Sequence, residues 1–222
     1  MRTTLPAVLA ASLVLLLGCA AGDAADEPAA TGAGGPTPTT SAAVPSTTIP
    51  APASTRPRSA AFDQALHDEL LAMLEADQLS RSGAADAEGD RARTRRLAEI
   101  LDQHGWPTVD LVGEDGEDAA WAIAQHSDLD PEVQGRALEL LRVAVGAGQA
   151  SPGNLAYLED RVAVGAGRPQ RYGTQVGCGQ DGPEPATPLV DEAAVEELRA
   201  AAGLDPLADY LDEMTAVCAA SD

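Results

Sequence analysis

The segment DLDPEVQGRALELLRVAVGAGQASPGNLAYLEDRVAV, residues 128–164, contains the same helix-start signal twice. Asp130-Pro131 and Ser151-Pro152 each place a capping side chain directly before a proline, which suits the first position of a helix. Leucine and valine residues then recur at helical spacing, and a glycine-containing break separates the two patterns. We therefore predict one helix from Pro131 to about Val145 and another from Pro152 to about Val164.

Similar patterns extend over the rest of the chain from residue 60 onward. Apolar residues recur at helical spacing in further stretches. Between Pro169 and Val176 the pattern alternates with a period of two, which is typical of a strand, and glycines and prolines follow. We expect a mainly α fold, a single domain of about seven helices with a short β strand or hairpin near 169–190. The further helices are predicted at 60–79, 91–104, 115–126, 191–202 and 205–219.

The N-terminal residues resemble the export signal of a bacterial lipoprotein. An apolar run of about 13 residues, Leu5–Leu17, follows Arg2; it is too short to span a bilayer and matches a signal-peptide core. Leu16-Leu17-Gly18-Cys19 has the form of a lipobox, in which the cysteine is acylated and becomes the mature N-terminus. We predict a signal peptide at 1–18 and lipidation of Cys19. The alternative is an ordinary secretory signal with an incidental cysteine.

Residues 19–59 differ in composition from the rest of the chain. They are rich in proline, threonine and alanine and contain no aromatic residue. Such a segment cannot bury enough apolar surface to offset the entropy of ordering it. We predict that 19–59 form the lipidated N-terminus and a disordered tether, and that residues 60–222 form the helical domain.

The charge balance restricts both the chemistry and the partners. The chain has 35 acidic and 14 basic residues, a net charge of −21, and every basic residue is arginine. The absence of lysine excludes a Schiff-base lysine and a P-loop lysine. The negative charge argues against nucleic acid and against adhesion to anionic lipid. We expect contact with the membrane through the N-terminal lipid, on the extracytoplasmic face of the cell membrane, with no nucleic acid, no cofactor and a monomeric chain.

Three cysteines are present. If Cys19 carries lipid, Cys178 and Cys218 remain, and an even remainder in an exported protein permits a disulfide between them. The alternative is that these two residues are separate buried thiols. We predict the disulfide.

The chain carries no motif of a common catalytic class. Two sets of alternating acidic residues, 86–90 and 128–132, lack the glycine that a calcium loop needs at its sixth position, so we predict no metal site. His126 closes an apolar helix beside Gln125 and Asp128. It can be either a hydrogen-bonded structural histidine or a catalytic base.

Two other polar segments allow both a structural and a functional interpretation. Arg91, Arg93, Arg95 and Arg96 are balanced by nearby acidic residues, which predicts a solvated helix face. Residues 157–175 combine tyrosines, an aspartate, an arginine and glutamines. Such a set can line a cleft, or it can form a buried network that determines the packing.

Four short motifs follow one another in a specific order. They are Gly105-Trp106-Pro107, Gln125-His126, Asp160-Arg161-Val162 and Gln170-Arg171-Tyr172-Gly173-Thr174-Gln175. Together they resemble an uncharacterised bacterial domain family, one of the domains of unknown function, over roughly residues 60–212. The resemblance implies no established activity, but it gives weight to one constellation. Its members are His126, Asp160, Arg161, Tyr172 and Gln175.

We expect a membrane-anchored bacterial surface lipoprotein whose helical domain is a binding or structural module. The alternative is an envelope hydrolase or transferase in which His126 is the general base and the other four residues of the constellation complete the catalytic site. Because buried polar groups must be paired, we expect His126 to bond within one cluster that includes the predicted strand or the Asp160-Arg161 helix end.

Overall fold

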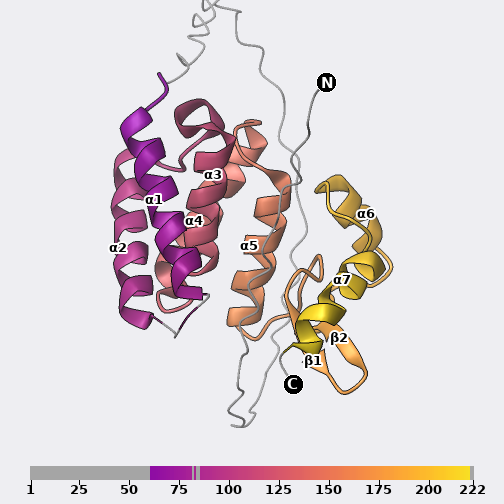
Figure 1. Ribbon diagram of the computed structural model, residues 1–222. Coiled ribbons are helices and arrows are strands. Elements are labelled where there is room, and N and C mark those ends of the chain that lie inside the picture. The colour runs from indigo at the N-terminus through magenta and orange to yellow at the C-terminus, as the bar shows by residue number, and fades with distance from the viewer. Residues whose placement is uncertain (1–60, 82, 84–85, 221–222) are drawn as a thin grey trace, which may run out of the picture. The chain divides into compact units, whose positions relative to one another are not determined.

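Seven helices and a two-stranded antiparallel sheet make up the part of the chain that the computed structural model describes, residues 61–81, 83 and 86–220 (Figure 1). The mainly α fold with a hairpin within 169–190 is therefore confirmed. The predictions for residues 1–59, including Cys19 and the tether, lie outside the described residues.

The elements are α1 (Gln64–Arg81), α2 (Ala87–His104), α3 (Val109–Gln125), α4 (Pro131–Gly146), α5 (Pro152–Gly165), β1 (Val176–Gly179), β2 (Gly182–Pro185), α6 (Val195–Ala201) and α7 (Leu207–Ala219).

The caps read from the sequence are present at α4 and α5. The side chain of Asp130 accepts a hydrogen bond from the amide of Val133, and that of Ser151 accepts from the amide of Asn154. In both helices a proline follows the cap, where its missing N–H leaves no bond unmade. Local sequence alone thus determines where these two helices begin.

The start of α3 differs from the prediction. The sequence pattern indicates a helix from residue 115, whereas α3 begins at Val109 and is kinked at Gly113. Gly113 has φ 78°, and a Cβ there would lie 2.9 Å from Asp115 Oδ1. The helical periodicity becomes regular only after this kink, which explains why the sequence reveals only the second part of α3.

The apolar core is centred on α3, which packs against α1, α2, α4 and α5. Its buried face is rich in alanine, and small side chains allow neighbouring helices to approach closely. Larger side chains from the surrounding helices fill the remaining space. Fully buried members of the core include Leu70, Leu97, Ile100, Ile123, Leu141 and Leu158.

The C-terminal elements β1, β2, α6 and α7 pack against one another. The two strands pair as a hairpin, and α7 packs against both of them and against α6. Cys178 of β1 and Cys218 of α7 are joined by a disulfide, with their Cα atoms 5.5 Å apart. This is the pairing expected from the sequence, and it ties the last helix to the hairpin. No described helix is both long and apolar enough to cross a membrane.

Candidate functional site

The segment that ends α3 bonds to three different helices. Three consecutive side chains, at positions 126 to 128, point to different neighbours, so a short piece of chain joins much of the bundle. The last carbonyls of a helix lack partners within it, and here Gln134 Nε2 of α4 donates to the carbonyls of Ala124 and Gln125. The pairs are His126 with Asp77 of α1, Ser127 with Thr94 of α2, and Asp128 with Arg161 of α5.

His126 belongs to a group of charged side chains between α1 and α2, which we call the His126 cluster: Asp77, Arg81, Asp90, Arg93 and His126. Arg81 Nη2 donates to Asp77 Oδ1 at 3.0 Å and to Asp90 Oδ1 at 3.1 Å. Arg93 Nη2 donates to Asp90 Oδ1 at 2.6 Å, and its Nε lies 3.7 Å from Asp77 Oδ1. Two carboxylates thus balance two guanidinium groups in a site with little access to water.

Asp77 is the most deeply placed member, with a side chain only 1% exposed. Burial raises the pKa of its carboxyl, but the hydrogen bonds and charges of His126 and Arg81 outweigh burial, so the pKa is lowered overall. Asp77 therefore remains an anion inside the bundle and holds the surrounding cations in place.

His126 presents Nδ1 to two partners of opposite character. Asp77 Oδ2 lies 2.8 Å from Nδ1, and Arg81 Nε lies 3.1 Å from it. A protonated Nδ1 donates to the carboxylate, whereas an unprotonated Nδ1 accepts from the guanidinium, so the two bonds are alternatives. The His126 Nε2 atom has no hydrogen-bond partner among the described residues, and the side chain as a whole is 9% exposed.

A second group is centred on Asp160, in the second half of α5. This fully buried carboxylate accepts hydrogen bonds from the amides of Arg171, Tyr172 and Thr174, at 2.7, 3.1 and 3.0 Å. The hydroxyl of Thr174 donates to it as well, at 3.1 Å. Residues 170–175, which we call the Asp160 loop, therefore wrap around one carboxylate.

Gln170 and Gly173 give the Asp160 loop its shape. The side chain of Gln170 accepts from the amide of Gln175 at 2.8 Å and donates to the Gln175 carbonyl at 2.9 Å. The Gln170 amide group thus makes the two hydrogen bonds that the backbone of a paired strand would make to Gln175. Gly173 has φ 69°, and a Cβ there would lie 3.0 Å from Leu207 Cδ1. The strand predicted between Pro169 and Val176 is therefore wrong in position: the alternating polar residues encircle Asp160, and β1 begins at Val176.

The structure brings together four of the five residues of the predicted constellation. Tyr172 is bonded to Asp160 through its amide, and Arg161 donates to Gln175 Oε1 at 3.1 Å. The expectation that His126 bonds to this group is wrong, since among the described residues its partners are Asp77 and Arg81.

Arg199 of α6 connects the Asp160 loop to the C-terminal helices. It is 1% exposed, and among the described residues it has no carboxylate partner. Its Nη1 donates to the Tyr172 carbonyl at 2.8 Å, its Nε donates to the Asp205 carbonyl at 2.6 Å, and its Cζ lies 5.2 Å from the centre of the Tyr210 ring. Carbonyl dipoles and an aromatic face thus stabilise this buried cation.

Glu117 of α3 is a buried acid that is absent from the constellation predicted from the sequence. Trp106 Nε1 donates to its Oε1 and Asn154 Nδ2 donates to its Oε2, both at 3.0 Å. Burial is the main cause that raises the pKa of Glu117 to about 7. A signal was present in the sequence, because Glu117 lies at helical spacing within the apolar face that includes Ala120 and Ala124.

A family model for a family of unknown function, DUF6624, matches residues 64–218. The chain belongs to DUF6624. The matched range contains the His126 cluster, the Asp160 loop and Glu117. The expected membership of an uncharacterised family is confirmed, while its bacterial character and its motifs remain predictions. No curated protein and no solved structure matches the chain significantly. The described residues of this DUF6624 domain contain no group of three side chains suited to hold a metal ion.

Proposed function

We propose that this member of DUF6624 is a membrane-anchored surface lipoprotein whose helical domain is a binding or structural module. The observation that carries the proposal is the disulfide between Cys178 and Cys218. Disulfides persist in oxidising compartments and are rare in the cytosol. Of the three cysteines, the disulfide leaves Cys19, which follows the apolar run and is the one available for lipid.

The hydrogen bonds of the candidate residues support a module over an enzyme. The carboxylate of Asp160 is fully buried and accepts from the amides of the loop. Arg161 is engaged by Asp128 and Gln175, and Arg199 by backbone carbonyls. A catalytic group must reach a substrate, whereas these side chains already have partners that determine the packing.

The anchor is tested by expressing the full-length protein in a bacterial host and analysing the membrane fraction by mass spectrometry. We expect a mature N-terminus at Cys19 that carries acyl chains, and an uncleaved or unlipidated product for Cys19→Ala. The double variant Cys178→Ala/Cys218→Ala is the matched control, because it removes the other cysteines and should leave the lipid in place. An unmodified mature N-terminus at another residue would overturn the proposal.

A second function, an envelope hydrolase or transferase, is favoured by one specific observation. Nδ1 of His126 lies 2.8 Å from a buried aspartate, while Nε2 has no partner among the described residues. A carboxylate that orients one nitrogen of an imidazole leaves the other nitrogen able to take a proton from a substrate or water.

The variant His126→Gln separates the two functions. If His126 is structural, the free energy of unfolding falls by roughly 1–3 kcal/mol, because its partners lose a hydrogen bond. If it is also a general base, turnover found by screening the wild type against ester, amide, phosphate and glycoside substrates is lost as well. Turnover that survives in a stable variant would exclude the enzyme mechanism through His126.

A further inference from the structure

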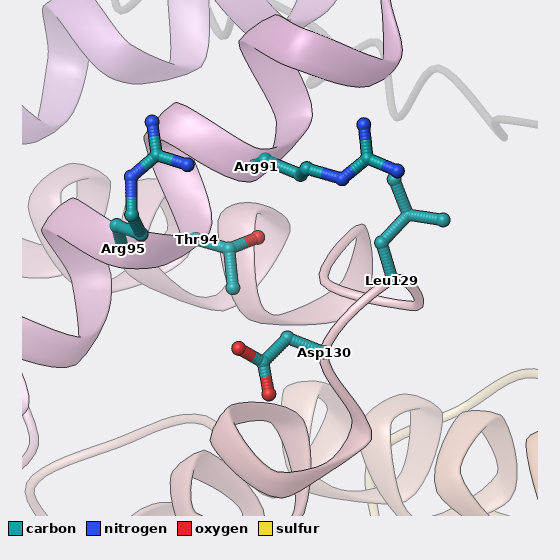
Figure 2. Close-up of a pocket in the computed structure, with 5 residues that line it drawn as sticks. All are labelled: Arg91, Thr94, Arg95, Leu129 and Asp130. Carbon is teal, nitrogen blue, oxygen red and sulfur yellow. The ribbon is translucent and has the colours of Figure 1, made fainter.

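A pocket of about 220 Å³ lies between α2 and the segment that precedes α4 (Figure 2). It is smaller than the roughly 300–1,000 Å³ of pockets that hold drug-sized ligands, so it suits a smaller molecule. It shares no lining residue with the His126 cluster, although both include residues of α2. The lining residues are Arg91, Thr94, Arg95, Leu129 and Asp130.

One wall of the pocket is positively charged in a chain whose net charge is −21. Arg91 and Arg95 lie one helical turn apart, with side chains 54% and 62% exposed. Their acidic neighbour is Glu88, at 4.0 Å from Arg91 and 3.8 Å from Arg95, and its side chain is 80% exposed. Ion pairs this open are worth little, so a ligand with a carboxylate can displace Glu88.

The opposite wall is negatively charged. Asp130 Oδ1 accepts the capping bond from the amide of Val133 at 3.3 Å, and Oδ2 accepts no hydrogen bond from the described residues. Figure 2 shows the Asp130 carboxylate on the opposite side of Thr94 from the two guanidinium groups. Leu129, which is 52% exposed, adds an apolar edge.

Thr94 gives the pocket a fixed floor between the charged walls. It is 3% exposed, and its hydroxyl donates to Ser127 Oγ, which in turn donates to the Ile123 carbonyl. These bonds hold the floor in place whether or not a ligand is present. In Figure 2 the guanidinium group of Arg91 extends toward Leu129 and that of Arg95 points away from Asp130, so both arginines must turn toward a shared ligand while the floor stays in place.

We propose that this pocket binds a small zwitterion, an amino acid or a dipeptide of small residues. The ligand carboxylate contacts Arg91 and Arg95, its ammonium group contacts Asp130, and a short apolar side chain contacts Leu129. Charges of both signs on facing walls favour a ligand that carries both over a simple anion. The inference rests on the proposed role as a binding module and names the class of its ligand.

The test is isothermal titration calorimetry of the purified full-length protein with four probes: L-alanine, L-alanyl-L-alanine, propionate and propylamine. We expect one of the two zwitterions to bind at least tenfold more tightly than either singly charged probe. The preferred zwitterion identifies the ligand as an amino acid or as a dipeptide. Saturable binding of none of the four probes at millimolar concentration would overturn the inference.

Four variants locate the binding. Arg91→Gln and Arg95→Gln should each weaken binding at least tenfold, whereas Arg136→Gln, which removes the same charge from the exposed ion pair of α4 with Asp102 of α2, should leave it unchanged. Asp130→Asn keeps a good helix cap but should remove the preference for a zwitterion over propionate.

Equal affinity in Arg91→Gln, Arg95→Gln and the Arg136→Gln control would place the ligand elsewhere and overturn the assignment. Glu88→Gln should tighten binding, because it removes the exposed competitor for the arginines. The titrations do not depend on lipidation. Mass spectrometry therefore tests the proposed lipid anchor, and calorimetry separately tests the proposed ligand pocket.

Discussion

His126 and Asp77 are 49 residues apart in the sequence, yet His126 Nδ1 lies 2.8 Å from Asp77 Oδ2 where the end of α3 meets α1. This contact joins the histidine to a network in which two aspartates and two arginines neutralise one another. The network has little access to water, so each member depends on the charge of the others.

Replacing Asp77 by Asn should therefore destabilise the domain strongly. The change removes a buried negative charge and leaves Arg81 and Arg93 with an excess of positive charge, which typically costs about 3–5 kcal/mol. Chemical denaturation followed by circular dichroism measures the loss. Asp68→Asn is the control, because Asp68 pairs with His67 at the surface and should have little effect. Equal stability of the two variants would contradict a role for the network.

Replacing Asp160 by Asn should release the Asp160 loop. An amide group cannot accept from the donors on both sides, so at least one charge-assisted hydrogen bond is lost, at about 1.5–3 kcal/mol each. Hydrogen exchange should accelerate at the amides of Arg171, Tyr172 and Thr174. Glu139→Gln, an exposed partner of Arg142 on α4, should leave their protection unchanged. Unchanged protection in Asp160→Asn would show that the loop does not need this carboxylate.

Glu117 should make stability depend on pH between about 5 and 8. Its folded pKa of about 7 lies above the ordinary value of 4.5, so the folded state holds a proton that the unfolded chain releases earlier. Its contribution is complete below pH 4.5 and is lost as the pH rises through 7, by roughly 3 kcal/mol in total.

Glu117→Gln, which resembles the protonated acid, should remove that part of the pH dependence and be the more stable protein at pH 8. Free energies of unfolding of both proteins across this range give the comparison. Glu114→Gln, on the same helix and exposed, is the control. Parallel curves for wild type and Glu117→Gln would contradict the raised pKa.

The disulfide should contribute about 4 kcal/mol, because it closes a loop across a sequence separation of 40. Titration of the exported, unreduced protein with a thiol reagent should find Cys178 and Cys218 unreactive. The variant Cys178→Ser/Cys218→Ser should unfold at a lower denaturant concentration, and adding a reductant should no longer affect it. Reactive thiols at both positions in the exported protein would contradict the pairing.

The helices of this domain are predictable because their signals are local. Asp130 and Ser151 act as caps within their own helix starts, and the apolar periodicity that follows is strong. The kink at Gly113 hides the first part of α3, since a single positive φ interrupts the pattern. The pairing of Cys178 with Cys218 could be expected because, of three cysteines, only these two remain once Cys19 is assigned to lipid.

The partners of the polar residues could not be predicted, because they come from distant parts of the chain. No local feature of Asp77 indicates that it contacts His126. The arginine-rich segment of α2 also divides in a way that composition does not reveal. Arg91 and Arg95 are exposed as expected, whereas Arg93 turns inward to Asp90. The polar residues of the Asp160 loop alternate along the sequence as they would in a strand. In a strand alternate residues share one face, and in this loop they surround the Asp160 carboxylate.

The segment 126–128, which contacts α1, α2 and α5 with successive side chains, restricts how the length of this protein can change. Each residue inserted into a helix rotates everything after it by about 100°. One residue added near the end of α3 would redirect all three side chains at once. We therefore expect natural insertions and deletions in DUF6624 proteins to gather at the α1–α2 and α4–α5 connections and to avoid the end of α3.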